Sequence, residues 1–192
     1  MAKDDAFGGK RDHEEDYFRK QDQELIEKMR KAAAADEARR ALGAKSGIDD
    51  PEILREIAQL GFTVDTMSLL PLVPILQVAW AEGGVSPAER ALILDVARKR
   101  GIEEGTAADR QLSEWLTHRP APDVFSRAGR LIAVMLAAGT EAVHDLSADD
   151  LVKYCESIAS ASGGILGIGK VSTGERAAIE QIQAALKGRG AR

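Results

Sequence analysis

The sequence predicts an all-α protein in two parts, a charged helical arm with its linker over residues 1–45 and a compact helical bundle over 46–192. Three observations lead to this prediction. The segment from Asp12 to Leu42 contains neither glycine nor proline. Helix-start signals recur along the remaining chain, two of them as copies of one another. Finally, the short alternating β-branched pattern of a strand is missing throughout.

The arm has the charge pattern of a helix that is stable without a core. Acidic residues precede basic residues by four positions, the order that supports an isolated helix, at Glu15/Arg19, Asp16/Lys20, Glu24/Lys28 and Glu27/Lys31. Its apolar side is thin, with Phe18, Leu25 and Met29 one to two turns apart. Tyr17 stands beside Phe18 within the charged run KRDHEEDYFRK, and adjacent aromatics in such a setting indicate a docking surface.

The next segments predict a linker and two helices. The stretch from Gly43 to Pro51 is typical of a linker that ends in a helix cap, with Asp50 as the capping acceptor and Pro51 as the first helical residue. The first helix runs to Leu60 and stops at Gly61. A more apolar helix is expected from about Val64 to Ala81, with its start shifted or its axis kinked by two prolines, Pro71 and Pro74.

An internal repeat is the clearest signal in the sequence. The segments Gly83 to Ala97 and Gly169 to Gln183 align without gaps at an offset of 86 residues. Each copy predicts a capping box, in which a serine side chain accepts from the amide three residues on and a glutamate reaches back to the serine amide. The capping pairs are Ser86 with Glu89 and Ser172 with Glu175.

Three further helices are expected between the two copies. Apolar spacing predicts them over Ala107 to Thr117, Val124 to Ala138 and Ser147 to Ser160, with a turn at His118 to Pro122. Ser147 and Asp150 form another plausible helix start. These helices complete the expected bundle.

Composition limits the kind of function. The arm has 11 basic and 11 acidic residues, whereas the rest of the chain has 15 basic and 20 acidic residues and accounts for the net charge of -5. Nucleic acid is therefore an unexpected partner. The longest apolar stretch, Leu69 to Ala81, is too short to span a membrane. With one cysteine, Cys155, and no signal peptide at the start, we expect a protein of the reducing cytoplasm.

The sequence offers no constellation for an enzyme. The stretch Gly164 to Lys170 matches the GxxxxGK part of a phosphate-binding loop, but Val171 replaces the serine or threonine that binds magnesium and no strand precedes it. Cys155 falls in the middle of an expected helix, where a packed thiol is the simpler interpretation. We therefore expect no catalytic residues and no required cofactor.

A weak metal site remains as an alternative. Glu82 and Glu89 flank the turn before the first repeat helix, with Ser86 between them. Such an oxygen-rich corner suits a hard cation such as calcium. The competing interpretation is structural, because the capping box already uses Glu89.

From about Leu69 onward, the segments VAWAEGGVSPAERALILDVARKRGI and SGGILGIGKVSTGERAAIEQI resemble the TerB-like, tellurite-resistance-associated domains. The resemblance implies an internally duplicated all-α fold and a role in stress-response assemblies or in calcium binding near the helix-helix turn. The chain departs from that pattern at the turn acid, which is Glu82 instead of the usual aspartate, and at Ile168, where an acid would be expected.

The arm from Phe7 to about Arg30 resembles the inhibitory segment of the mitochondrial-type F1-ATPase inhibitor family. The matching elements, in order, are Phe7-Gly8, Lys10-Arg11, Glu14-Glu15, Tyr17-Phe18-Arg19, Gln21 and Leu25-Ile26. The chain has an extra Gly9, and the stretch from Lys10 to Tyr17 looks about two residues shorter. The resemblance implies a helix that wedges into F1 and stops ATP hydrolysis.

These observations lead to two hypotheses about function. In the first, the chain is a non-enzymatic regulatory protein whose arm binds a protein partner, F1-ATPase in particular, through Glu14, Glu15, Tyr17, Phe18, Arg19, Leu25 and Met29. In the second, the TerB-like bundle is the functional part, as a scaffold or as a calcium sensor at Glu82 and Glu89. The arm then solvates the chain or joins it into oligomers.

Overall fold

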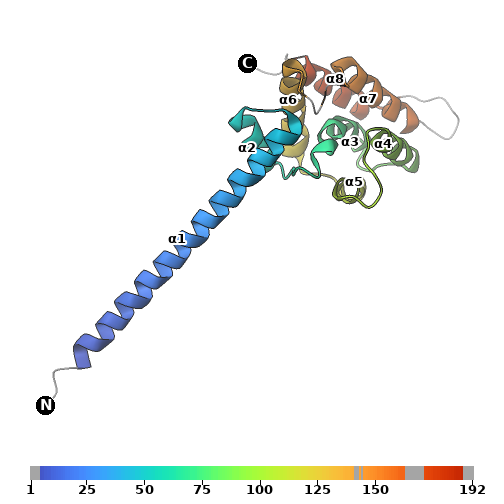
Figure 1. Cartoon of the computed structure of the whole chain (residues 1–192). Coiled ribbons are helices and arrows are strands. Elements are labelled where there is room, and N and C mark those ends of the chain that lie inside the picture. Colours follow the sequence, from blue (N-terminus) through green and yellow to red (C-terminus); the bar gives the residue numbers. More distant parts are fainter. Residues whose placement is uncertain (1–4, 141–142, 144, 163–170, 188–192) are drawn as a thin grey trace. The chain divides into compact units, whose positions relative to one another are not determined.

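The computed structural model describes residues 5–140, 143, 145–162 and 171–187, with side chains from Tyr17 onward except that of Ser162. The described residues form helices and no strands, so the protein is all-α, as predicted (Figure 1). The chain divides into two compact units, residues 1–40 and residues 41–192. None of the described helices is both long enough and apolar enough to cross a membrane.

The first unit is formed by most of one long helix, α1 (Asp5–Ser46). One of the expected ion pairs is seen at Lys31, whose Nζ lies 2.7 Å from Glu27 Oε1. Arg39 pairs in addition with Asp36, three residues before it. Such pairs support a helix that has little apolar surface of its own to bury.

The last turn of α1 belongs to the second unit and corrects the predicted linker. The helix continues beyond Leu42 through Gly43 and ends at Ser46, so that four residues remain before α2. A side chain at Gly43 would place its Cβ atom 3.0 Å from the carbonyl oxygen of Ile48, which explains why a glycine is tolerated inside the helix here. Gly47 then ends the helix with a φ of 68°, and its amide donates to the carbonyl of Gly43 at 2.9 Å.

The second unit contains the shorter helices in the order α2, η1, α3, α4, α5, α6, α7 and α8. Their bounds are α2 Pro51–Gln59, the 3₁₀ helix η1 Met67–Leu72, α3 Val73–Ala79, α4 Pro87–Lys99, α5 Ala107–Thr117, α6 Pro122–Ala138, α7 Ala148–Ser162 and α8 Thr173–Leu186. Asp50 caps α2 as predicted, with its Oδ1 atom accepting from the amides of Glu52 at 2.8 Å and Ile53 at 3.4 Å. Ser147 and Asp150 likewise bond one another's amides before α7.

The prolines divide the predicted helix over 64–81 into two parts. Pro71 lies in η1, whose tighter winding ends at Leu72, and Pro74 lies in the first turn of α3, where an amide hydrogen is not needed. The α3 helix contacts α4, α6, α7 and α8, and its residues Val73, Ile75, Leu76 and Val78 are almost fully buried. This short helix is therefore the centre of the core, as Figure 1 shows.

Both capping boxes form as predicted. Oε2 of the glutamate accepts from the serine amide at 2.7 Å in each copy, and the serine Oγ accepts from the glutamate amide at 3.3 Å before α4 and at 3.1 Å before α8. Glu89 is 3% exposed and Glu175 is 1% exposed. The start of α8 also lies against the turn after α3, because a Cβ atom at Gly174 would be 3.2 Å from the carbonyl oxygen of Ala81.

Candidate functional site

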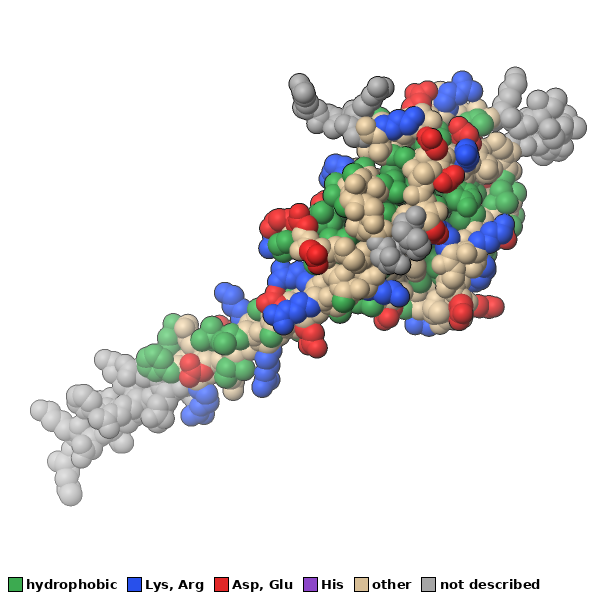
Figure 2. Space-filling view, turned by 45° about the horizontal axis from the view of Figure 1, so that its top comes forward, with side chains coloured by type: hydrophobic (Ala, Val, Ile, Leu, Met, Phe, Trp, Pro, Cys, Tyr) green, Lys and Arg blue, Asp and Glu red, His purple; other side chains and the backbone are tan. Residues whose placement is uncertain are grey.

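An exposed apolar stripe on α1 is the candidate site. It consists of Tyr17, Phe18, Leu25, Ile26 and Met29, whose side chains are between 49% and 64% exposed. By contrast, the large apolar side chains outside this stripe that the structure describes as exposed reach at most 45%. The stripe is the most exposed apolar surface in the described part of the chain, and Figure 2 shows hydrophobic side chains at the surface of this helix.

Helical periodicity explains the shape of the stripe. At about 100° per residue, Phe18, Leu25 and Met29 fall within a narrow sector, while Tyr17 and Ile26 lie on its two sides. Phe18 and Met29 are 11 residues apart, which corresponds to about 16 Å along the axis. The stripe is thus about three turns long.

The two aromatic rings are held together at one end of the stripe. Their centroids are 6.0 Å apart and their planes meet at 72°, which is an edge-to-face arrangement. Gln21 Nε2 donates to the Tyr17 hydroxyl oxygen at 3.0 Å, one turn further along. These contacts limit the rotamers of Tyr17 before any partner binds, which lowers the entropy lost on docking.

The other predicted partner-binding residues are described to different extents. Glu14 and Glu15 lie in α1 before Tyr17, where the structure does not describe the side chains. Arg19 is exposed one residue after Phe18. Leu25 and Met29 belong to the stripe, and Ile26 joins them. Ile26 was expected beside this apolar side of the helix, because it lies eight residues beyond Phe18.

The predicted metal corner has the structure of a helix cap. Glu89 is buried and its Oε2 atom accepts the Ser86 amide, while Glu82 is exposed in the preceding turn. Burial raises the pKa of Glu89, and the nearby carboxylates of Glu175 and Glu82 raise it further, against the hydrogen bonds from Ser86. Among the described residues, no group of three or more His, Cys, Asp or Glu side chains is placed to hold a metal ion.

Two further segments with possible chemistry were considered from the sequence, the single cysteine and the glycine-rich loop. Cys155 is fully buried in α7, and desolvation raises the pKa of its thiol to about 12, so it is neutral and inert near pH 7. The glycine-rich loop from Gly164 to Lys170 lies outside the described residues.

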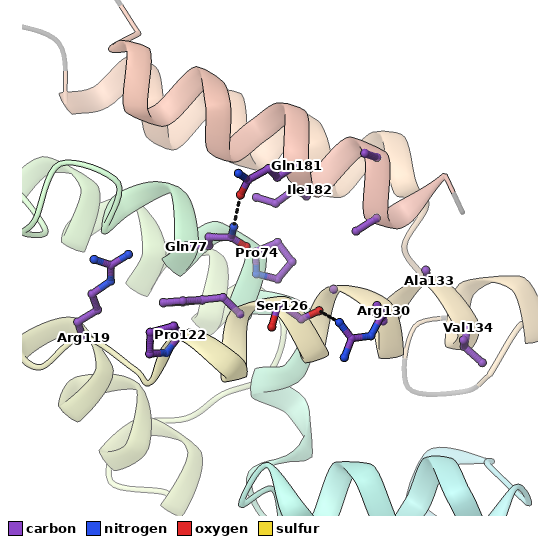
Figure 3. A pocket seen from close by; sticks show the side chains of 14 residues that line it. Pro74, Gln77, Arg119, Pro122, Ser126, Arg130, Ala133, Val134, Gln181 and Ile182 are labelled. Carbon is purple, nitrogen blue, oxygen red and sulfur yellow. Dashed lines mark hydrogen bonds between the residues drawn. The ribbon is translucent and has the colours of Figure 1, made fainter. Parts of the chain in front are cut away.

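An apolar groove on the second unit was not predicted from the sequence. It lies between α3, α6 and α8, and its volume is about 730 Å³ (Figure 3). Gln77 on α3 and Gln181 on α8 meet across it at 3.5 Å, although they are 104 positions apart in the sequence. No local motif marks these residues, so only the packing of the three helices reveals the groove.

No protein-family model, curated protein or solved structure matches the chain.

Proposed function

We propose that this chain is a non-enzymatic regulatory protein of the cytoplasm whose N-terminal helix binds a protein partner through the apolar stripe of α1. The observation that carries the proposal is the exposure of five large apolar side chains on one helix, with Phe18 at 63% and Met29 at 64%. Contiguous apolar surface that remains exposed is typical of an interaction site. Burial of such side chains in a partner groove would supply the binding free energy.

The residue types also support binding to a protein. Aromatic side chains dominate the energetics of protein interfaces, because one ring buries a large area with few rotatable bonds. Tyr17 and Phe18 are adjacent and already in contact, so they can enter a single pocket as a pair. Arg19 follows directly and adds a charged contact at the edge of the docking surface. This arrangement fits recognition of a helix in a groove.

F1-ATPase is the partner that the sequence resemblance names. In this proposal Tyr17 and Phe18 are the apolar anchors, Glu14, Glu15 and Arg19 make charged contacts, and Leu25 and Met29 extend the docking surface. The continuous helix from Asp5 to Ser46 supports the proposal, because a helix is the form that the inhibitory segment of that family takes. The outcome of binding would be the arrest of ATP hydrolysis.

The test is a titration of the full chain into F1-ATPase from the same organism, with ATP hydrolysis as the readout. We expect inhibition at micromolar chain, and we expect the double variant Tyr17→Ala, Phe18→Ala to weaken it at least about tenfold. A matched double variant on the second unit, Leu92→Ala with Tyr154→Ala, removes two partly exposed side chains that are 38% and 36% exposed. This control should inhibit like the original chain.

Two separate results test the identity of the partner and the surface that binds it. Unchanged hydrolysis at micromolar chain would reject F1-ATPase. Capture of interacting proteins by the full chain, compared with the Tyr17→Ala, Phe18→Ala variant, then tests the stripe itself. Equal capture by both chains would show that the stripe is not the binding surface.

A further inference from the structure

The groove between α3, α6 and α8 has the form of a helix-binding site. One face of α6 forms its long side, through Pro122, Phe125, Ser126, Gly129, Arg130, Ala133 and Val134. These positions recur at intervals of three and four residues and extend over about 18 Å from the first to the last. Figure 3 shows Pro122 and Val134 at opposite ends of this face.

Small side chains line the groove from two of its helices. Gly129 and Ala133 line it from α6, and Ala184 and Ala185 line it from α8. A Cβ atom at Gly129 would be 3.5 Å from the Cβ atom of Ala185, so the two helices are in close contact beneath it. Val134 stands at one end with its side chain 45% exposed. A row of large apolar side chains could therefore enter and pack against this surface.

The charged residues that line the groove, among those described, are both arginines. Arg119 lies near Pro122, with its guanidinium carbon 6.0 Å from the centre of the Phe125 ring. Arg130 donates from Nη1 to the carbonyl oxygen of Ser126 at 3.2 Å, and its Nη2 atom is 3.8 Å from Glu56 Oε1. Its side chain is still 62% exposed. The groove thus favours an apolar segment with acidic residues beside it.

The apolar stripe of α1 has these properties. Its length of about 16 Å between Phe18 and Met29 matches the groove. Between Tyr17 and Met29 the helix has three acidic and three basic residues, so the position of each charge around the axis matters more than their sum. Asp22 lies within about 40° of Phe18 around the axis, whereas Arg19 lies about 100° away. An acidic side chain therefore faces the same way as the large apolar ones.

We propose that the groove binds the apolar stripe of α1 from a second copy of this chain. The agreement in length, the small residues of the groove and the position of Asp22, which can face the arginines of the groove, support this occupant together. Exchange of arms between two copies is reciprocal, so that each copy contributes one groove and one stripe to a symmetric dimer. The dimer covers the stripe when the external partner is absent, and the partner must compete with it.

The first experiment measures self-association of the full chain by sedimentation velocity from 1 to about 100 µM. We expect dimers, and we expect both Val134→Glu in the groove and Phe18→Ser in the stripe to weaken association at least about tenfold. Leu92→Glu is the matched control, since it adds the same charge at another exposed apolar position, and it should dimerise like the original chain. A chain that stays monomeric at 100 µM would overturn the proposal.

A mixing experiment distinguishes arm exchange from pairing of two arms. The Val134→Glu chain retains its stripe, and the Phe18→Ser chain retains its groove, so an equimolar mixture should form a heterodimer with one intact contact. If the arms pair with each other instead, Val134→Glu will dimerise alone as the original chain does, and the proposal is then wrong.

Charge reversal provides a test that remains valid even if the Val134→Glu variant does not fold. Arg130→Glu changes a mostly exposed side chain and should weaken the dimer, and the combination with Asp22→Arg should restore it by at least about fivefold. Failure of rescue, with helicity unchanged by circular dichroism, would count against the assigned contact. Inhibition of F1-ATPase is measured separately, so a monomeric chain that still inhibits would reject this inference and leave the proposed function intact.

Discussion

The two repeated helices, α4 and α8, begin with the same geometry and differ in what surrounds them. The capping serines have nearly identical backbone angles, with φ and ψ of -67° and 160° at Ser86 and of -66° and 165° at Ser172. Pro87 follows the first serine, whereas Thr173 follows the second. The repeated residues therefore specify how a helix starts. The residues that differ reflect the different packing around each helix start.

The position before each glutamate shows the difference in surroundings most clearly. Ala88 and Gly174 are both exposed, but a Cβ atom at Gly174 would lie 3.2 Å from the Ala81 carbonyl oxygen. Both glutamates are buried, so each cap is part of the core as well as a local motif. The comparison teaches that one local motif can be placed in two tertiary settings without a change in its own hydrogen bonds.

The largest expected effect comes from the isoleucine that the two copies share. Ile93→Ala and Ile179→Ala should each lower the free energy of unfolding by about 2–5 kcal/mol, because each leaves a cavity in the core. Ile93 is 0% exposed and Ile179 is 8% exposed, so the first loss should be the larger. Urea denaturation measures both. Leu92→Ala, at an exposed position beside Ile93, should cost much less, and equal losses at all three positions would contradict the assignment of the core.

Removal of the capping carboxyl is the next test. Glu89→Ala and Glu175→Ala leave the amides of Ser86 and Ser172 without their acceptors, which should cost about 1–3 kcal/mol each. The control is Glu180→Ala on the exposed side of α8, where a change within about 0.5 kcal/mol is expected. A loss in one copy alone would show that the two caps are alike in geometry but not in energy.

Proline at position 173 would make the second copy more like the first. Thr173 is exposed at the first helical position, and Ser172 before it has the extended conformation that a following proline requires. Thr173→Pro should therefore raise the free energy of unfolding by about 0.4–1 kcal/mol, chiefly by restricting the unfolded chain. Thermal unfolding measures the gain. A lower midpoint would show that the two starts differ more than their backbone angles indicate.

The smallest expected effect is a dependence of stability on pH that arises at Glu89. The pKa of Glu89 in the folded state is raised above its ordinary value of 4.5. Below that value the group is protonated in both states and contributes nothing to pH dependence. As the pH rises, the unfolded state ionises first, so stability falls until the pH passes the folded-state pKa and the penalty becomes constant.

Comparison with Glu89→Gln isolates this contribution, because glutamine keeps the size of the side chain without its charge. Between about pH 4 and pH 7, the wild-type chain should lose stability relative to the variant. Denaturation curves at both pH values measure the difference, with Glu180→Gln as the control. A difference that grows in the opposite direction would contradict the raised pKa.

Local signals explain why much of the fold could be predicted. The capping boxes, the Asp50 and Pro51 start of α2 and the helix from Ala107 to Thr117 depend on residues within a few positions of one another. The extension of α1 through Gly43 could not be predicted, because it depends on the close approach of Ile48 and Leu54 from beyond the helix. A glycine there would otherwise indicate a helix end.

The same distinction applies to the candidate site. The exposure of Tyr17, Phe18 and Met29 follows from their isolation in a charged segment, so the sequence predicts it. The groove is different, because Pro74, Phe125 and Ala185 come from three helices and carry no common pattern. Tertiary packing brings them together, and a single sequence does not encode that in any local period.

Gly174 has a consequence for how the duplicated halves tolerate change. Any L-amino acid other than glycine at this position would place its Cβ atom 3.2 Å from the Ala81 carbonyl oxygen, which is closer than an ordinary van der Waals contact. Duplication of a sequence gives both halves the same freedom to vary, but this contact restricts substitution at position 174 and not at the equivalent Ala88. Equivalent positions in the two copies should therefore differ in the substitutions that they tolerate. The largest difference is expected between positions 88 and 174.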